Sequence, residues 1–124
     1  MEISLEEMKR IVKNSKKAIK ALLMDQNKIA GIGNIYSDEI LFQSGLRPDR
    51  SASDIDDKQI QKLYKQTKRV LEYAIKHDAN PDKFGQSYIL PNRGKGNECP
   101  NCGTPIETIK TAGRTTYFCP QCQK

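Results

Sequence analysis

The four cysteines of the chain form two Cys-x-x-Cys pairs, Cys99 with Cys102 and Cys119 with Cys122. Two thiolates at this spacing can grip one metal ion from a single tight turn, and two such turns supply the four ligands of a closed tetrahedral zinc site. Gly103 follows the first pair and should let backbone N–H groups turn toward the sulfurs. Because four thiolates leave no open position, the spacing predicts one structural zinc ion, not a catalytic one.

Two other uses of the cysteines stay open from the residues alone. Disulfides would suit a secreted protein, but the sequence shows no apolar signal segment at its start. A redox Cys-x-x-Cys motif normally lies beside a strand–helix–strand pattern, which the sequence does not show. Zinc is therefore the favoured interpretation, and reduced cysteines predict a cytoplasmic location, at the nucleoid if the source is bacterial.

Asn34 and Arg114 are the residues best placed to bind phosphate. Asn34 follows Gly31-Ile32-Gly33, and glycines before a helix expose N–H groups where the helix dipole is positive. The local pattern favours the simpler role, in which Asn34 only caps its own helix. Arg114 follows Gly113 at the tip of a predicted hairpin, where it either contacts phosphate or is a solvated turn residue.

The elements that must position these residues are mainly helical. Apolar residues recur at helical spacing after Ser4, and turn residues separate the later segments. The helix that includes residues 60–74 should be capped by Ser53 or Asp54. The predicted elements are a helix after Ser4, helices at 16–24, from 34 to about 44 and from about 55 to 77, and strands at 107–110 and 115–118 that turn at 112–113.

The net charge and the length of the chain narrow the classes of function that the sequence can have. The chain has 124 residues and a net charge of +6, with basic runs at 9–28, which includes Lys20, and at 91–124. Positive charge at both ends suits a polyanion lying across two elements, although a solvated lysine face would look the same. No apolar run approaches membrane-spanning length. The composition predicts a helical domain over 1–80, a linker over 81–96 and a metal-stapled finger over 97–124.

Four blocks of the sequence resemble the formamidopyrimidine-DNA glycosylase/endonuclease VIII family, whose enzymes remove oxidised bases from DNA. The blocks are LLMDQ at 22–26, AGIGNIY at 30–36, DEILF at 38–42 and GRTTYFCPQCQK at 113–124. The resemblance covers nearly the whole chain but only the C-terminal half of such an enzyme. It implies a mainly α fold, with a helix–two-turn–helix domain followed by a four-cysteine β-hairpin zinc finger.

The resemblance favours phosphate binding over the simpler roles of Asn34 and Arg114. It implies that Asn34 and Arg114 contact the DNA backbone where the duplex kinks and a nucleotide is extruded. The predicted DNA-binding residues are accordingly Asn34, Arg114, Gly33 and Lys28. The implied partner is double-stranded DNA carrying abasic or oxidised lesions.

One departure from the family concerns its chemistry. The family's catalytic domain begins with Pro then Glu, whose amine and carboxylate carry base removal, whereas this sequence opens Met1-Glu2-Ile3. No catalytic residue is predicted, and whether the chain is an enzyme stays open. The leading hypothesis is a DNA-binding module that holds bent or damaged duplex by its backbone. It would be either a natural truncated relative of the family or one half of a glycosylase, whose partner would be the missing N-terminal catalytic domain. The alternatives are a weak amine-based lyase at abasic sites and a zinc-dependent protein- or RNA-binding module.

Overall fold

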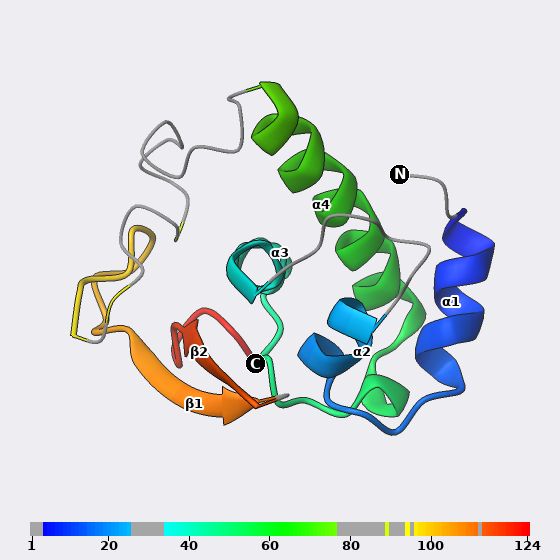
Figure 1. Cartoon of the computed structure of the whole chain (residues 1–124), viewed down its shortest axis with the longest axis horizontal. Coiled ribbons are helices and arrows are strands. Elements are labelled where there is room, and N and C mark those ends of the chain that lie inside the picture. Colours follow the sequence, from blue (N-terminus) through cyan, green and yellow to red (C-terminus); the bar gives the residue numbers. More distant parts are fainter. Residues whose placement is uncertain (1–3, 26–33, 77–88, 90–93, 95, 112) are drawn as a thin grey trace.

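The computed structural model describes residues 4–25, 34–76, 89, 94, 96–111 and 113–124 (Figure 1). The chain is mainly helical up to its middle, and its C-terminal part forms a short antiparallel hairpin, which confirms the predicted fold class. None of the described helices is both long and apolar enough to cross a membrane. The elements are α1 (Leu5–Lys13), α2 (Ile19–Asp25), α3 (Asn34–Ser44), a short 3-10 helix η1 (Ala52–Asp54), α4 (Asp57–Lys76), β1 (Glu107–Thr111) and β2 (Arg114–Phe118).

Helix α1 begins where the sequence predicts. The Ser4 hydroxyl accepts a hydrogen bond from the Glu7 N–H at 3.2 Å, which satisfies one free donor of the first turn. Glu6 and Glu7 place negative charge at the positive end of the helix dipole. The helix buries Met8 and Val12 on one face, and this face packs into the helical core described below.

Helix α2 starts at Ile19, later than the predicted start at Lys16. The preceding segment is instead paired with a distant loop, since Ala18 and Ser51 form an isolated antiparallel bridge. The N–H of Ile19 donates to the carbonyl of Arg50 at 2.8 Å. Backbone groups used in this pairing are not available for a helical turn, which explains why the prediction was wrong at this boundary.

The cap of α4 is also different from the prediction. Asp56, and not Ser53 or Asp54, caps the helix, because the latter two residues belong to η1. The Asp56 carboxylate accepts from the Gln59 N–H at 2.8 Å, and the Gln59 side chain accepts from the Asp56 N–H at 3.0 Å. This reciprocal pair is a capping box that fixes the start of the longest helix. The expected last residue of that helix, His77, lies outside the described residues.

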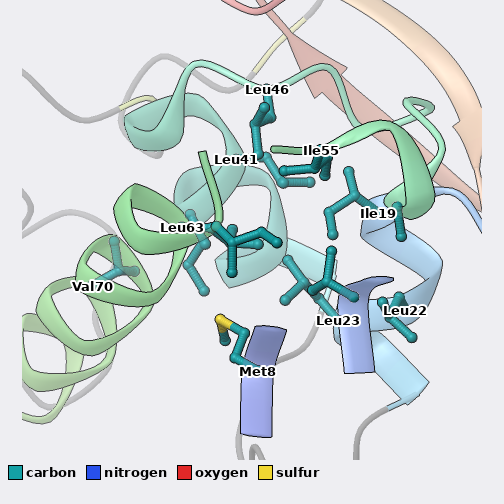
Figure 2. Close-up of a cluster of buried hydrophobic side chains, with 13 residues drawn as sticks. Met8, Ile19, Leu22, Leu23, Leu41, Leu46, Ile55, Leu63 and Val70 are labelled. Atoms are coloured by element: carbon teal, nitrogen blue, oxygen red, sulfur yellow. The ribbon is translucent and has the colours of Figure 1, made fainter. Parts of the chain in front are cut away.

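The helical region is held by one cluster of apolar side chains, called here the helical core. Figure 2 shows side chains from α1, α2, α3 and α4 converging, with Met8, Leu23, Leu41 and Leu63 among them. Burial of such side chains is worth roughly 1.5–3 kcal/mol each before the entropy cost of ordering them. The members are Met8, Val12, Ile19, Leu22, Leu23, Ile40, Leu41, Leu46, Ala52, Ile55, Ile60, Leu63 and Val70.

Helix α3 is the element shared between the two halves of the molecule. It contacts α2 and α4 on one side and β2 on the other (Figure 1), and residues 37–42 are all buried. Ile40 and Leu41 belong to the helical core, whereas Phe42 belongs to a second cluster, the finger core. A helix covered all round needs no polar face, which accounts for its lack of amphipathic character. The finger core consists of Phe42, Ile89, Cys99, Ile106 and Cys119.

Candidate metal centre and nucleic-acid interface

The four cysteine sulfurs converge on one point. All four Sγ atoms lie within 4.8 Å of one another. Three of the separations are 3.8 Å for Cys99–Cys122, 3.5 Å for Cys102–Cys119 and 3.5 Å for Cys102–Cys122. Thiolates bound about 2.3 Å from a zinc ion at the centre of a tetrahedron lie about 3.8 Å apart. The donor set and its spacing therefore fit one closed tetrahedral zinc site.

Each Cys-x-x-Cys turn aims a backbone N–H at its first sulfur. The N–H of Asn101 donates to Cys99 Sγ at 3.4 Å, and that of Cys122 donates to Cys119 Sγ at 3.4 Å. Gly103 adopts a positive φ of 77°, and its own N–H donates to the Cys99 carbonyl at 2.9 Å. The two N–H bonds to sulfur orient the ligands and stabilise the thiolate charge, while the Gly103 bond closes the first turn.

The thiols differ in how readily they lose a proton. Hydrogen bonding to Thr104, whose hydroxyl lies 3.2 Å from the sulfur, lowers the pKa of Cys102 to about 6. Burial raises the pKa of Cys119 and of Cys122. Cys102 thus offers an anionic ligand near neutral pH, whereas the other two thiols give up their protons when the metal binds. This arrangement serves a structural ion and provides no open position for a reaction.

The hairpin presents Arg114 at its tip. β1 and β2 pair antiparallel with Thr111 opposite Arg114, and Gly113 takes a φ of 71° in the turn between them. Arg114 and Lys110 are both exposed. The predicted strands and turn are confirmed, apart from Ala112, which lies outside the described residues. A rigid, metal-pinned hairpin therefore holds an arginine out toward solvent.

The other predicted DNA-binding residues are less completely described. Helix α3 is described from Asn34 onward, and because the residues before it lie outside the described part of the chain, the predicted N-cap role of Asn34 stays a prediction. Gly33 and Lys28 lie outside the described residues. The two functional candidates that the structure does place, Asn34 and Arg114, stand at the first positions of α3 and β2, two elements in contact with each other.

The end of the chain fastens the finger to the helices. Gln123 is fully buried, and its side chain accepts from the Cys119 N–H at 2.8 Å while donating to the Leu46 carbonyl at 2.9 Å. The N–H of Lys124 donates to the Gly45 carbonyl at 2.9 Å. The metal knuckle is therefore bonded directly to the loop that follows α3.

A buried ion pair joins the same regions, and sequence reasoning missed it. Lys20 Nζ lies 2.8 Å from Asp38 Oδ1, and both side chains have an exposed fraction of zero. The Lys20 ammonium also donates to the Thr116 hydroxyl at 2.6 Å. Assigning Lys20 to a basic surface run was wrong, because its charge is enclosed between α2, α3 and β2.

Known families match both halves of the chain. Residues 1–84 match the family described as the formamidopyrimidine-DNA glycosylase H2TH domain, and residues 96–124 match the zinc finger found in FPG and IleRS. This match and the four-sulfur cluster together assign one structural zinc ion to the site. The predicted zinc cofactor is confirmed.

Curated relatives and solved structures agree with these matches. A formamidopyrimidine-DNA glycosylase of Listeria monocytogenes is 44% identical in an alignment of 123 positions that covers 91% of this chain and 45% of the relative. One of Trichodesmium erythraeum is 42% identical, covering 86% of this chain and 39% of the relative.

Among solved structures, the Lactococcus lactis Fpg in complex with DNA containing an abasic site superposes with a TM-score of 0.86 at 31% identity, covering 98% of this chain and 47% of that one. A Lactococcus lactis FPG mutant bound to Fapy-dG DNA gives 0.85 at 30% identity, covering 98% and 48%. The chain spans about half the length, or less, of the curated relatives that it matches.

Proposed function

Because the chain belongs to the formamidopyrimidine-DNA glycosylase H2TH-domain family, we propose that it binds damaged or bent duplex DNA through the backbone phosphates. Solved relatives are complexes with DNA that contains an abasic site or Fapy-dG. The observation that carries the proposal is the exposed Arg114, held at the tip of a hairpin whose strand β2 packs against α3. A protein with this role would act in the cytoplasm, at the nucleoid in a bacterium.

The two groups proposed to bind phosphate, Arg114 and the start of α3, both suit an anion. The guanidinium of Arg114 offers a planar fork of N–H donors that suits phosphate oxygens. The start of α3 at Asn34 offers the positive end of a helix dipole. Lys110, exposed on the neighbouring strand opposite Thr115, adds a second positive charge to the hairpin. Contacts of this kind fix register on the duplex without reading its sequence, so binding should have low sequence specificity.

Base removal itself is a separate part of the proposal. The resemblance implies that the family's nucleophilic amine lies in an N-terminal catalytic domain, and the match to this chain covers the other half of its relatives. We propose that the chain supplies the grip on DNA, while any glycosylase chemistry depends on such a domain. A bent duplex held by its backbone would favour extrusion of a nucleotide toward that partner.

A salt titration of DNA binding tests the proposal. With about three phosphate contacts, the affinity for a short duplex should fall roughly 40-fold between 50 and 200 mM salt. Replacing Arg114 with Ala should reduce the slope of log affinity against log salt by about 0.9, the value of one lost contact. Arg69→Ala is the matched control, since Arg69 is exposed on α4, on the other side of α3 from the hairpin (Figure 1).

The outcomes separate backbone binding from its rivals. An unchanged slope for Arg69→Ala together with a reduced slope for Arg114→Ala would support the proposal. A salt-independent affinity would contradict binding through phosphates. The same reduction for both variants would show only a nonspecific effect of net charge.

A further inference from the structure

Burying the charges of Lys20 and Asp38 carries a large desolvation cost. Neither side chain is exposed, and the ammonium and carboxylate lie 2.8 Å apart between α2 and α3. Replacing such a pair with well-packed apolar residues often leaves a protein as stable or more stable. Stability alone therefore does not explain the ion pair, and its contacts indicate another role.

Both charges reach across to the strand that begins with Arg114. The Lys20 ammonium donates to the Thr116 hydroxyl at 2.6 Å, and Asp38 Oδ2 accepts from the Tyr117 N–H at 3.2 Å. The Thr116 hydroxyl in turn donates to the backbone carbonyl of Arg114 at 3.3 Å. A continuous chain of polar contacts thus runs from the helices to the backbone of the arginine.

We propose that Lys20 is a positioning residue that sets the direction of Arg114 through the Thr116 hydroxyl. The inference rests on the proposed function, in which Arg114 contacts phosphate. Hydrogen bonds are directional, so this chain fixes the orientation of the strand end, whereas an apolar contact would fix mainly its distance. Lys20 itself cannot contact DNA in this arrangement, because its side chain is wholly buried.

The neighbouring turn explains why the arginine needs such a support. Gly113, which precedes it, adopts a positive φ of 71°, and apart from its two chain neighbours no described residue has an atom within 4 Å of the position where a Cβ would stand. The tip is thus open to solvent on that side. The bond from the Lys20 ammonium to the Thr116 hydroxyl and the bond from the Tyr117 N–H to Asp38 instead hold β2 against α2 and α3.

The decisive experiment is a double-mutant cycle between Thr116 and Arg114, read by fluorescence anisotropy with a duplex that carries a stable abasic-site analogue. Thr116→Val keeps the shape of the side chain and removes the hydroxyl. It should weaken binding roughly 3- to 10-fold, the range that corresponds to one net hydrogen bond. In an Arg114→Ala background the same change should produce no further loss, because the residue that it positions is gone.

Two further variants distinguish positioning from general damage. Thr116→Ser restores the hydroxyl and should return the affinity to that of the unmodified chain. Thr108→Val makes the same chemical change on β1, opposite Tyr117, and should leave the affinity unchanged. If Thr116→Val lowers zinc content or melting temperature, the double variant Lys20→Met with Asp38→Leu replaces it. That chain should fold with an apolar pair and still lose the affinity that Arg114 provides.

The possible results are all informative. Loss with Thr116→Val, no further loss without Arg114 and rescue by Ser support the inference. Independent, additive losses from Thr116→Val and Arg114→Ala overturn it while leaving phosphate contact by Arg114 intact. If Arg114→Ala alone binds DNA as tightly as the unmodified chain, the proposed role of Arg114 fails and the positioning inference fails with it.

Discussion

The helical region and the finger are stabilised by different physics. The helical core gathers apolar side chains from α1, α2, α3 and α4 and contains no metal site among its residues. Among the described residues of the finger core, the finger contributes Ile106, Cys99 and Cys119, with Tyr117 and Cys122 packed against them, while Phe42 comes from α3. The difference indicates that the helices fold by burying apolar surface. The finger instead folds by binding an ion and by packing against the folded helix α3.

Removing the zinc should cause the largest difference in folding between the finger and the helical region. Structural zinc sites in peptides bind with apparent free energies of about 10–16 kcal/mol, which is folding free energy for a segment with so small a core. Chelation, or Cys99→Ser, should unfold the finger and leave most of the helical signal. Circular dichroism together with amide hydrogen exchange would measure the two regions separately.

The control for chelation is the zinc-reloaded chain, which should recover exchange protection in β1 and β2. Equal loss of protection in α1 and α4 would show that the helices depend on the ion as well. Retention of the hairpin without metal would contradict the structural role of the zinc.

A cavity in the helical core should destabilise the helical region before it affects the finger. Leu41 is fully buried on α3, and Leu41→Ala should cost about 2–5 kcal/mol of unfolding free energy through lost burial and the cavity that remains. Denaturant unfolding of the zinc-loaded chain would measure the change. Gln61→Ala, at an exposed position of α4, is the control and should stay within about 0.5 kcal/mol.

The connection between the regions can be loosened at Gln123. Gln123→Met keeps most of the side-chain volume but leaves the Cys119 N–H and the Leu46 carbonyl without their present partner. Buried backbone groups left in this way cost roughly 1–3 kcal/mol, so zinc affinity and protection of the finger should both fall. Gln121→Met, an exposed position in the same knuckle, should change neither quantity. Similar losses in both variants would contradict the specific role of the amide.

The smallest effect is expected at the exposed pair of Lys13 and Asp57, which joins α1 to α4. The hydrogen bond from Lys13 holds the pKa of Asp57 below its usual value. A lowered folded-state pKa means that the stabilisation is present above the unfolded pKa and is lost as the pH falls through the folded one. Thermal melting of Asp57→Asn should show a small decrease at neutral pH and none in acid. A difference that grows in acid would contradict this assignment.

Local signals in the sequence predicted much of the molecule. The cysteine spacing, the start of α1 after Ser4 and the hairpin depend on residues close together in the chain, and all three are confirmed. The start of α2 and the Asp56 cap were missed, because pairing of Ala18 with Ser51 and the turn η1 are tertiary effects. Local propensity does not contain such contacts.

The Lys20–Asp38 pair was the most important omission at the candidate site. A lysine in a basic run is normally solvated, so burial of its charge depends on a partner distant in the sequence. One signal was available: Asp38 and Glu39 stand in a helix whose neighbours Ile40, Leu41 and Phe42 leave no polar face. Acidic residues in such a helix must find partners, which indicates an interface with another element.

The most direct test of the proposed DNA grip is anisotropy of the zinc-loaded chain with two duplexes, one intact and one carrying a stable abasic-site analogue. We expect binding with preference for the abasic duplex, since a flexible site is easier to bend. Arg114→Ala should lose about 1–3 kcal/mol of binding free energy while keeping its zinc and its melting temperature. Absence of binding to either duplex, or unchanged affinity in Arg114→Ala, would contradict the account.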